Sequence, residues 1–131
     1  MKILRSLATI LALGTSTYAH AENVLIVLSD SDRLDLKDGK VFKTGFYLNE
    51  LMQPVKALLD ACHDITFATP KGMAPSVDRT SIDKMYFGGD EAAMKASEAQ
   101  LSELGLMSSD KSPVISLARV EQIGYDHFDA V

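Results

Sequence analysis

The sequence predicts an α/β domain with parallel strands, and two observations lead to that prediction. Two short apolar segments, 23–28 (NVLIVL) and 64–69 (DITFAT), have the composition of strands buried in a sheet. Between them, residues 46–61 repeat apolar side chains at the spacing of a helix that lies on a sheet. A strand, a helix and a second strand in this order imply a right-handed parallel crossover.

Residues 1–21 are predicted to be a secretory signal peptide. A basic start precedes a short apolar run at 7–13, and Ala19-His20-Ala21 is a small-x-small cleavage pattern. The run is shorter than the roughly 20 residues that cross a bilayer. An uncleaved amphipathic helix is the alternative. We expect the mature chain, 22–131, to be one small periplasmic or secreted domain with no membrane attachment after cleavage.

The composition argues against several partners and cofactors. Thirteen basic residues against 18 acidic ones give a net charge of −5, which argues against nucleic acid. The aspartates of 29–38 lack EF-hand spacing, so we interpret 29–43 as an exposed loop instead of a cation site. His127 has no neighbours at metal-ligand spacing, and Gly88-Gly89 has no phosphate-loop pattern. We therefore expect neither a metal nor an organic cofactor.

The later elements follow from turn and capping residues. Residues 70–72 end the second strand, and 73–89 are expected to be irregular. Asp90 can cap a helix over 91–104, and Gly105 can end it. Residues 114–123 fit either a helix or a strand. Residues 128–131 look like the start of a third strand, within which the chain is expected to be truncated.

Glu50 is the candidate catalytic residue. Pro54 cannot donate to the Glu50 carbonyl and crowds it, so the helix is expected to bend there. Glu50 shares a column with the small residues Pro54, Ala57 and Ala61, which predicts a half-buried carboxylate. At the carboxyl end of the first strand it would lie where open α/β sheets bind ligands, suited to exchanging a proton. The alternative is a first-turn glutamate that the helix dipole stabilises.

Cys62 and His63 are a second, weaker candidate. A cysteine beside a histidine can be a nucleophile with its base. Both residues, however, follow the helix, at the sheet edge opposite the one that binds ligands. Cys62 also stands where helices often end in glycine, so we interpret it as a chemically quiet thiol. As the single cysteine it forms no intramolecular disulfide.

Several segments resemble one known family. NVLIVLSD, TGFYLNELMQP and DITFATPKG resemble the amino-terminal half of the ThiJ/PfpI superfamily, also called class I glutamine amidotransferase-like, in its glyoxalase III/chaperone-like branch. The pattern T-G-[FYW]-x-x-E-[LF]-x-x-P is matched from Thr44 to Pro54, with Glu50 at its acidic position. Further matches to family positions are Pro75, Asp78, Ser81 and 128–131.

The resemblance implies a fold and an activity. It implies a flavodoxin-like three-layer sandwich, often dimeric, with the third strand beside the first. Full-length relatives are glutathione-independent glyoxalases (methylglyoxal to lactate), deglycases, amidohydrolases or peptidases that use a cysteine nucleophile, or holdase chaperones. Glu50 corresponds to the glutamate that hydrogen-bonds that cysteine, and a small reactive aldehyde would be the substrate.

The chain also departs from the family. The P-G-G-H-G loop and the C-H-G nucleophile elbow that follow the third strand in the family do not occur in the sequence. We therefore expect the chain to be inactive alone. Two alternatives remain: a non-catalytic holdase or binding fragment that uses exposed apolar surface, and a receiver or flavodoxin-type binding domain.

Overall fold

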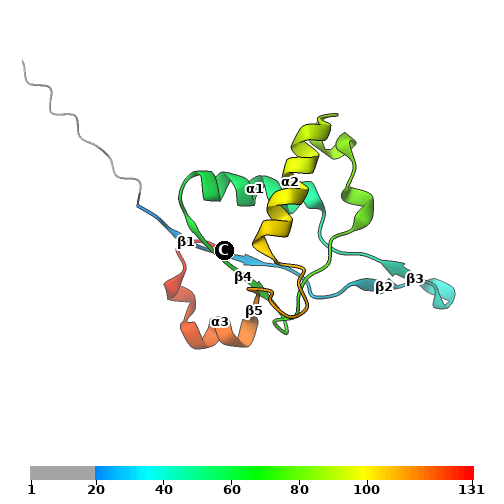
Figure 1. Cartoon of the computed structure of the whole chain (residues 1–131). Helices are drawn as coiled ribbons and strands as arrows, with labels where there is room; N and C mark the ends of the chain where they lie inside the picture. Colours follow the sequence, from blue (N-terminus) through cyan, green and yellow to red (C-terminus); the bar gives the residue numbers. More distant parts are fainter. Residues whose placement is uncertain (1–19) are drawn as a thin grey trace, which may run out of the picture.

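The computed structural model describes residues 20–131, so positions 1–19 of the predicted signal peptide lie outside the described part. Its main sheet contains β1 (Asn23–Val27), β4 (Asp64–Thr69) and β5 (Ile115–Ser116), in the order β1-β4-β5. Both strand pairings are parallel, which confirms the predicted α/β class (Figure 1). Within 20–131, no helix is long and apolar enough to cross a membrane.

The last residues of the chain lie beside β1, on the side opposite β4. The Asp129 N–H donates to the Asn23 carbonyl at 2.8 Å, and the Leu25 N–H donates to the Ala130 carbonyl at 2.9 Å. Val24 and Ala130 form a parallel bridge. Residues 129–131 therefore extend the sheet where a flavodoxin-like strand order places the third strand.

Helices cover both faces of this sheet. The helices α1 (Leu48–Asp60) and α2 (Glu91–Leu104) lie on one face, and α3 (Leu117–Ile123) lies on the other (Figure 1). Because side chains alternate along a strand, β4 supplies both cores. Phe67 packs with α1 and α2, whereas Ala68 packs with Leu25 and Val120. The result is a three-layer sandwich.

The structure corrects the prediction that 29–43 is a loop. This segment forms an antiparallel hairpin of β2 (Arg33–Asp35) and β3 (Val41–Lys43), joined by a short 3-10 turn, η1 (Lys37–Gly39). Asp38 and Gly39 both have positive φ, 67° and 71°. An Asp-Gly pair between alternating apolar residues predicts a hairpin. The sequence prediction missed this signal because the many charged residues around it are also typical of an exposed loop.

The remaining elements resolve the other expectations. The helix predicted over 91–104 is confirmed, with the Asp90 side chain accepting from the Ala93 N–H and Gly105 at φ 66°. The ambiguous segment 114–123 divides into β5 and α3, because the Ser116 hydroxyl accepts from the Arg119 N–H and starts a helix. Two short 3-10 turns, η2 (Arg79–Ser81) and η3 (Lys84–Phe87), lie in the segment expected to be irregular.

Gly45 lies where two backbone segments meet closely. The Phe46 N–H donates to the Ser76 carbonyl at 2.9 Å, and the Asp78 N–H donates to the Phe46 carbonyl at 2.8 Å. A Cβ atom at position 45 would lie 2.0 Å from the Ser76 carbonyl oxygen. No side chain fits there without moving one of the two backbones.

Gly45→Ala is expected to lower the free energy of unfolding by about 3 kcal/mol or more, because the backbone contact must open. Urea titration followed by circular dichroism measures this. Gly39→Ala is the matched control: nothing lies within 4 Å of its Cβ position, so only the positive φ should cost, at about 1–2 kcal/mol. Equal losses in the two variants would contradict the close-contact explanation.

Candidate functional site

The start of α1, which carries Glu50, is held by a residue distant in sequence. Tyr47 precedes the helix and offers no side-chain cap. Instead, the hydroxyl of Ser81 accepts from the Leu48 N–H at 2.9 Å and donates to the Asp78 carbonyl at 2.5 Å. Ser81 is fully buried. Because helix N–H groups need acceptors, this bond fixes where α1 begins.

Asp78 orders the segment that provides this cap. Its carboxylate accepts from the Thr80 hydroxyl at 2.6 Å, from the Thr80 N–H at 2.9 Å and from the Thr44 hydroxyl at 3.5 Å. These donors, the Thr80 hydroxyl above all, lower the pKa of Asp78 below its ordinary value of 3.8. Asp78 and Ser81, two of the positions that resemble the family, therefore act in positioning α1.

Glu50 lies in the first turn of α1, beside a hollow of about 400 Å³. The hollow runs along the edge of β1 near the end of the chain. Its other lining residues are mainly apolar: Val24, Leu25, Ile26, Val27, Leu28, Phe46, Tyr47, Leu51, Pro54, Leu58 and Val131. The structure thus places the predicted catalytic carboxylate of Glu50 at the mouth of this apolar hollow.

The expected half-burial of Glu50 is wrong in this structure. Glu50 is exposed, and so are Pro54, Ala57 and Ala61 of the same column. The helix continues through Pro54, whose missing N–H leaves the Glu50 carbonyl without its helical donor. The small-residue column was predicted to pack against a neighbouring element, and no part of 20–131 covers it. A helical column identifies a face of a helix, but only the tertiary contacts decide what covers it.

Cys62 and His63 lie at the other end of α1, roughly 18 Å from Glu50 along the helix axis. Cys62 is exposed at φ 62°, its N–H donates to the Leu59 carbonyl, and the His63 N–H donates to the Leu58 carbonyl. These two bonds form a Schellman motif. The His63 Nδ1 accepts from the Glu22 N–H at 3.1 Å. Both residues therefore end the helix and tie it to the start of β1.

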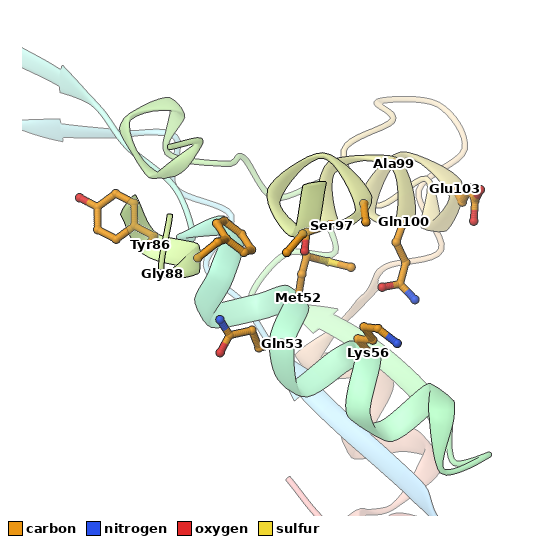
Figure 2. Close-up of a pocket in the computed structure, with 12 residues that line it drawn as sticks. Met52, Gln53, Lys56, Tyr86, Gly88, Ser97, Ala99, Gln100 and Glu103 are labelled. Carbon is orange, nitrogen blue, oxygen red and sulfur yellow. The ribbon is translucent and has the colours of Figure 1, made fainter. Parts of the chain in front are cut away.

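A larger hollow, of about 630 Å³, lies between α1, α2 and η3. Figure 2 shows Met52 between the two helices, with Lys56 and Gln100 at the rim. Sequence reasoning missed this groove. The available signal was the run of small residues on α2, Ala93, Ala96 and Ser97, which leaves room beside Met52.

Tyr86 lines the groove and meets Tyr47, which lines the hollow beside Glu50. Their rings are 5.5 Å apart in an edge-to-face arrangement at 73°. The neighbouring Tyr47 phenol raises the pKa of Tyr86 above its ordinary value of 10.0, with burial as a second cause. Tyr86 is thus a neutral hydrogen-bonding group at ordinary pH.

Among residues 20–131, no three His, Cys, Asp or Glu side chains gather in a group that could hold a metal ion.

Comparison with known proteins does not establish a family. No family model matches the chain, and no curated protein matches it. Ten chains of solved structures match. One of them, a crystal structure of the protein designated APC35852, is 26% identical over 58% of this chain and 34% of its own length, with a TM-score of 0.40. The chain thus spans about a third of the length of that protein.

Cys62→Gly is expected to raise the free energy of unfolding by about 0.5–1 kcal/mol, because glycine adopts positive φ without steric cost. Thermal and urea unfolding, each followed by circular dichroism, measure the change. Cys62→Ala is the matched control: it removes the thiol but keeps the strained Cβ, so its stability should stay near that of the unmodified chain. A Cys62→Gly variant less stable than Cys62→Ala would contradict the helix-ending role.

Proposed function

We propose that this chain is a ThiJ/PfpI-like protein and supplies the amino-terminal part of a cysteine-dependent, glyoxalase III-like site. Glu50 is the proposed proton-holding group of that site. The observation that carries the proposal is the position of Glu50, in the first turn of α1 at the mouth of an apolar hollow along β1. Open α/β sheets bind their ligands at this edge.

The motif residues have roles consistent with the proposal. Gly45 permits the close backbone contact before α1, and Leu51 is buried in the core. Pro54 lines the hollow together with Glu50. These three residues therefore lie in or beside the segment of α1 that carries Glu50.

The proposed chemistry needs a cysteine thiolate that adds to the aldehyde carbon of a small substrate such as methylglyoxal. Glu50 would hold or relay the proton during that reaction. Cys62 does not supply the thiolate, because it ends α1 at the opposite edge of the sheet. We therefore propose that residues 20–131 alone do not convert methylglyoxal, and that the nucleophile belongs to a segment following the third strand.

A chimera tests this function directly. Residues 22–131 are joined, at the third strand, to the carboxyl-terminal half of a full-length ThiJ/PfpI glyoxalase, and lactate formation from methylglyoxal is measured. The chimera is expected to be active, and Glu50→Gln to lower kcat about 10²- to 10⁴-fold, because a positioned proton-transfer group contributes that much. Asp60→Asn, a charge removal at the far end of α1, should leave the rate unchanged.

Two outcomes would contradict the proposal. One is a folded chimera, judged by circular dichroism and gel filtration, that retains full activity after Glu50→Gln. The other is lactate formation by the unfused chain that Cys62→Ser abolishes, because this would make Cys62 the nucleophile.

A second candidate is a non-catalytic holdase, favoured by the apolar side chains left exposed beside Glu50. Val27 is 45% exposed and Val131 is 81% exposed, and both line the hollow. Exposed apolar surface of this kind can hold unfolded segments of other proteins.

A light-scattering assay with thermally unfolding citrate synthase tests the holdase. If the hollow binds clients, suppression of aggregation should survive Glu50→Gln and fall severalfold in Val27→Lys, which places a charge in the hollow. Val41→Lys on the hairpin is the matched control and should have little effect. Absence of suppression at equimolar chain, or equal loss in both lysine variants, would exclude the hollow as the binding surface.

A further inference from the structure

The groove between α1, α2 and η3 has the size of a small-molecule site. Its volume of about 630 Å³ lies within the roughly 300–1,000 Å³ that such sites occupy. It shares no lining residue with the hollow beside Glu50. Sites of this kind combine an apolar lining with a few polar groups that orient the ligand. The two sets of side chains therefore indicate which ligand fits the groove.

The apolar part of the groove favours a flat aromatic ring. Met52 is buried and lies between the two helices (Figure 2), and a thioether makes favourable contacts with aromatic rings. Phe87 of η3 lines the groove and offers a second aromatic contact, edge-to-face or offset-stacked. On the α2 side, Ala93 and Ala96 present only methyl groups, which leaves space for a ring between the helices.

The charges of the groove favour an uncharged ligand. Among residues 20–131, one cation and one anion line the groove, Lys56 and Glu103. Lys56 is already paired with Asp60, one turn further along α1. An anionic ligand would meet Glu103 and no unpaired cation, and a cationic ligand would meet the Lys56 ammonium. Neither kind of ligand therefore gains a clear electrostatic attraction in the groove.

Two glutamine side chains supply neutral hydrogen-bonding groups, one from each helix. Gln53 lies on α1, and the half-buried Gln100 lies on α2. Figure 2 shows the Gln100 side chain extending from α2 toward the α1 side of the groove. A carboxamide carries both N–H donors and a carbonyl acceptor. A ligand that has a carboxamide of its own can therefore donate to and accept from the same glutamine.

We propose that this groove binds a small, uncharged aromatic carboxamide. Its ring lies against Met52 and Phe87, and its amide forms hydrogen bonds with Gln100. The site is separate from Glu50, so its test does not depend on the activity proposed for the chain.

Titration of the purified chain with benzamide, followed by ¹⁵N–¹H NMR, tests the proposal. We expect saturable shifts concentrated at the backbone amides of the groove residues, with a Kd on the order of 1 mM for so small a ligand. Benzoate and benzamidine have nearly the same shape and carry a negative and a positive charge. Each should bind about fivefold more weakly than benzamide, because neither gains an unpaired opposite charge.

Three variants separate the groove from a nonspecific surface, with circular dichroism to check that each is folded. Ala96→Leu fills the groove and should weaken benzamide binding about tenfold, because a larger side chain takes the space of the ring. Ser102→Leu is the matched control, at an exposed position of α2 that does not line the groove. Gln100→Glu should reverse the preference in favour of benzamidine, because a carboxylate accepts charge-assisted hydrogen bonds from an amidinium.

Four outcomes would overturn the proposal. The first is the absence of saturable shifts up to about 20 mM benzamide, well above the expected Kd. The second is binding that Ala96→Leu leaves unchanged, and the third is a preference of the unmodified chain for benzoate or benzamidine. The fourth is a set of groove shifts that depends on protein concentration without ligand, because a second copy of the chain would then occupy the groove.

Discussion

The contact between the backbone before α1 and the segment 76–81 determines where α1 begins and therefore where Glu50 lies. Gly45 lets the two backbones meet, and Phe46 bonds to Ser76 and Asp78 in a short parallel bridge. A few residues on, Ser81 caps α1 through the Leu48 N–H. A helix dipole and a candidate carboxylate are thereby fixed at the carboxyl end of β1. Without this contact the chain would still contain its strands, but α1 would have no defined start.

The same arrangement separates the two residues that look most reactive in the sequence. Glu50 begins α1 and Cys62 ends it, so the helix itself holds them at opposite edges of the sheet. His63 bonds to the backbone before β1 and thereby joins the helix end to the sheet. The proposed site therefore depends on Glu50 and the hollow along β1, whereas Cys62 ends α1 through its backbone conformation and hydrogen bonds.

Two exposed apolar surfaces within residues 20–131 differ in their surroundings. The hollow beside Glu50 is bounded by the sheet edge and α1. The hairpin of β2 and β3 projects from the body of the molecule, and its side chains Leu34, Leu36 and Phe42 are exposed.

Much of the fold follows from local sequence. The strands 23–28 and 64–69, the helix between them and the helix over 91–104 were predictable, because burial period and capping residues such as Asp90 and Gly105 act over a few positions. The hairpin was also encoded locally, by Asp38-Gly39 between alternating residues, although many charges surround that signal. Residues 114–123 stayed ambiguous because β5 is only two residues long and exists through its pairing with β4.

The candidate site was only partly predictable, because its geometry depends on residues far apart in the chain. Sequence identified Glu50 and the glycine-like position of Cys62, since helix position and backbone conformation are local properties. Only the tertiary structure decided that Ser81 caps α1, that Glu50 is exposed, and that Met52 borders a groove with α2. The exposure of a side chain and the capping of a helix by a distant residue depend on which segments pack against that helix. Local sequence patterns do not contain this information.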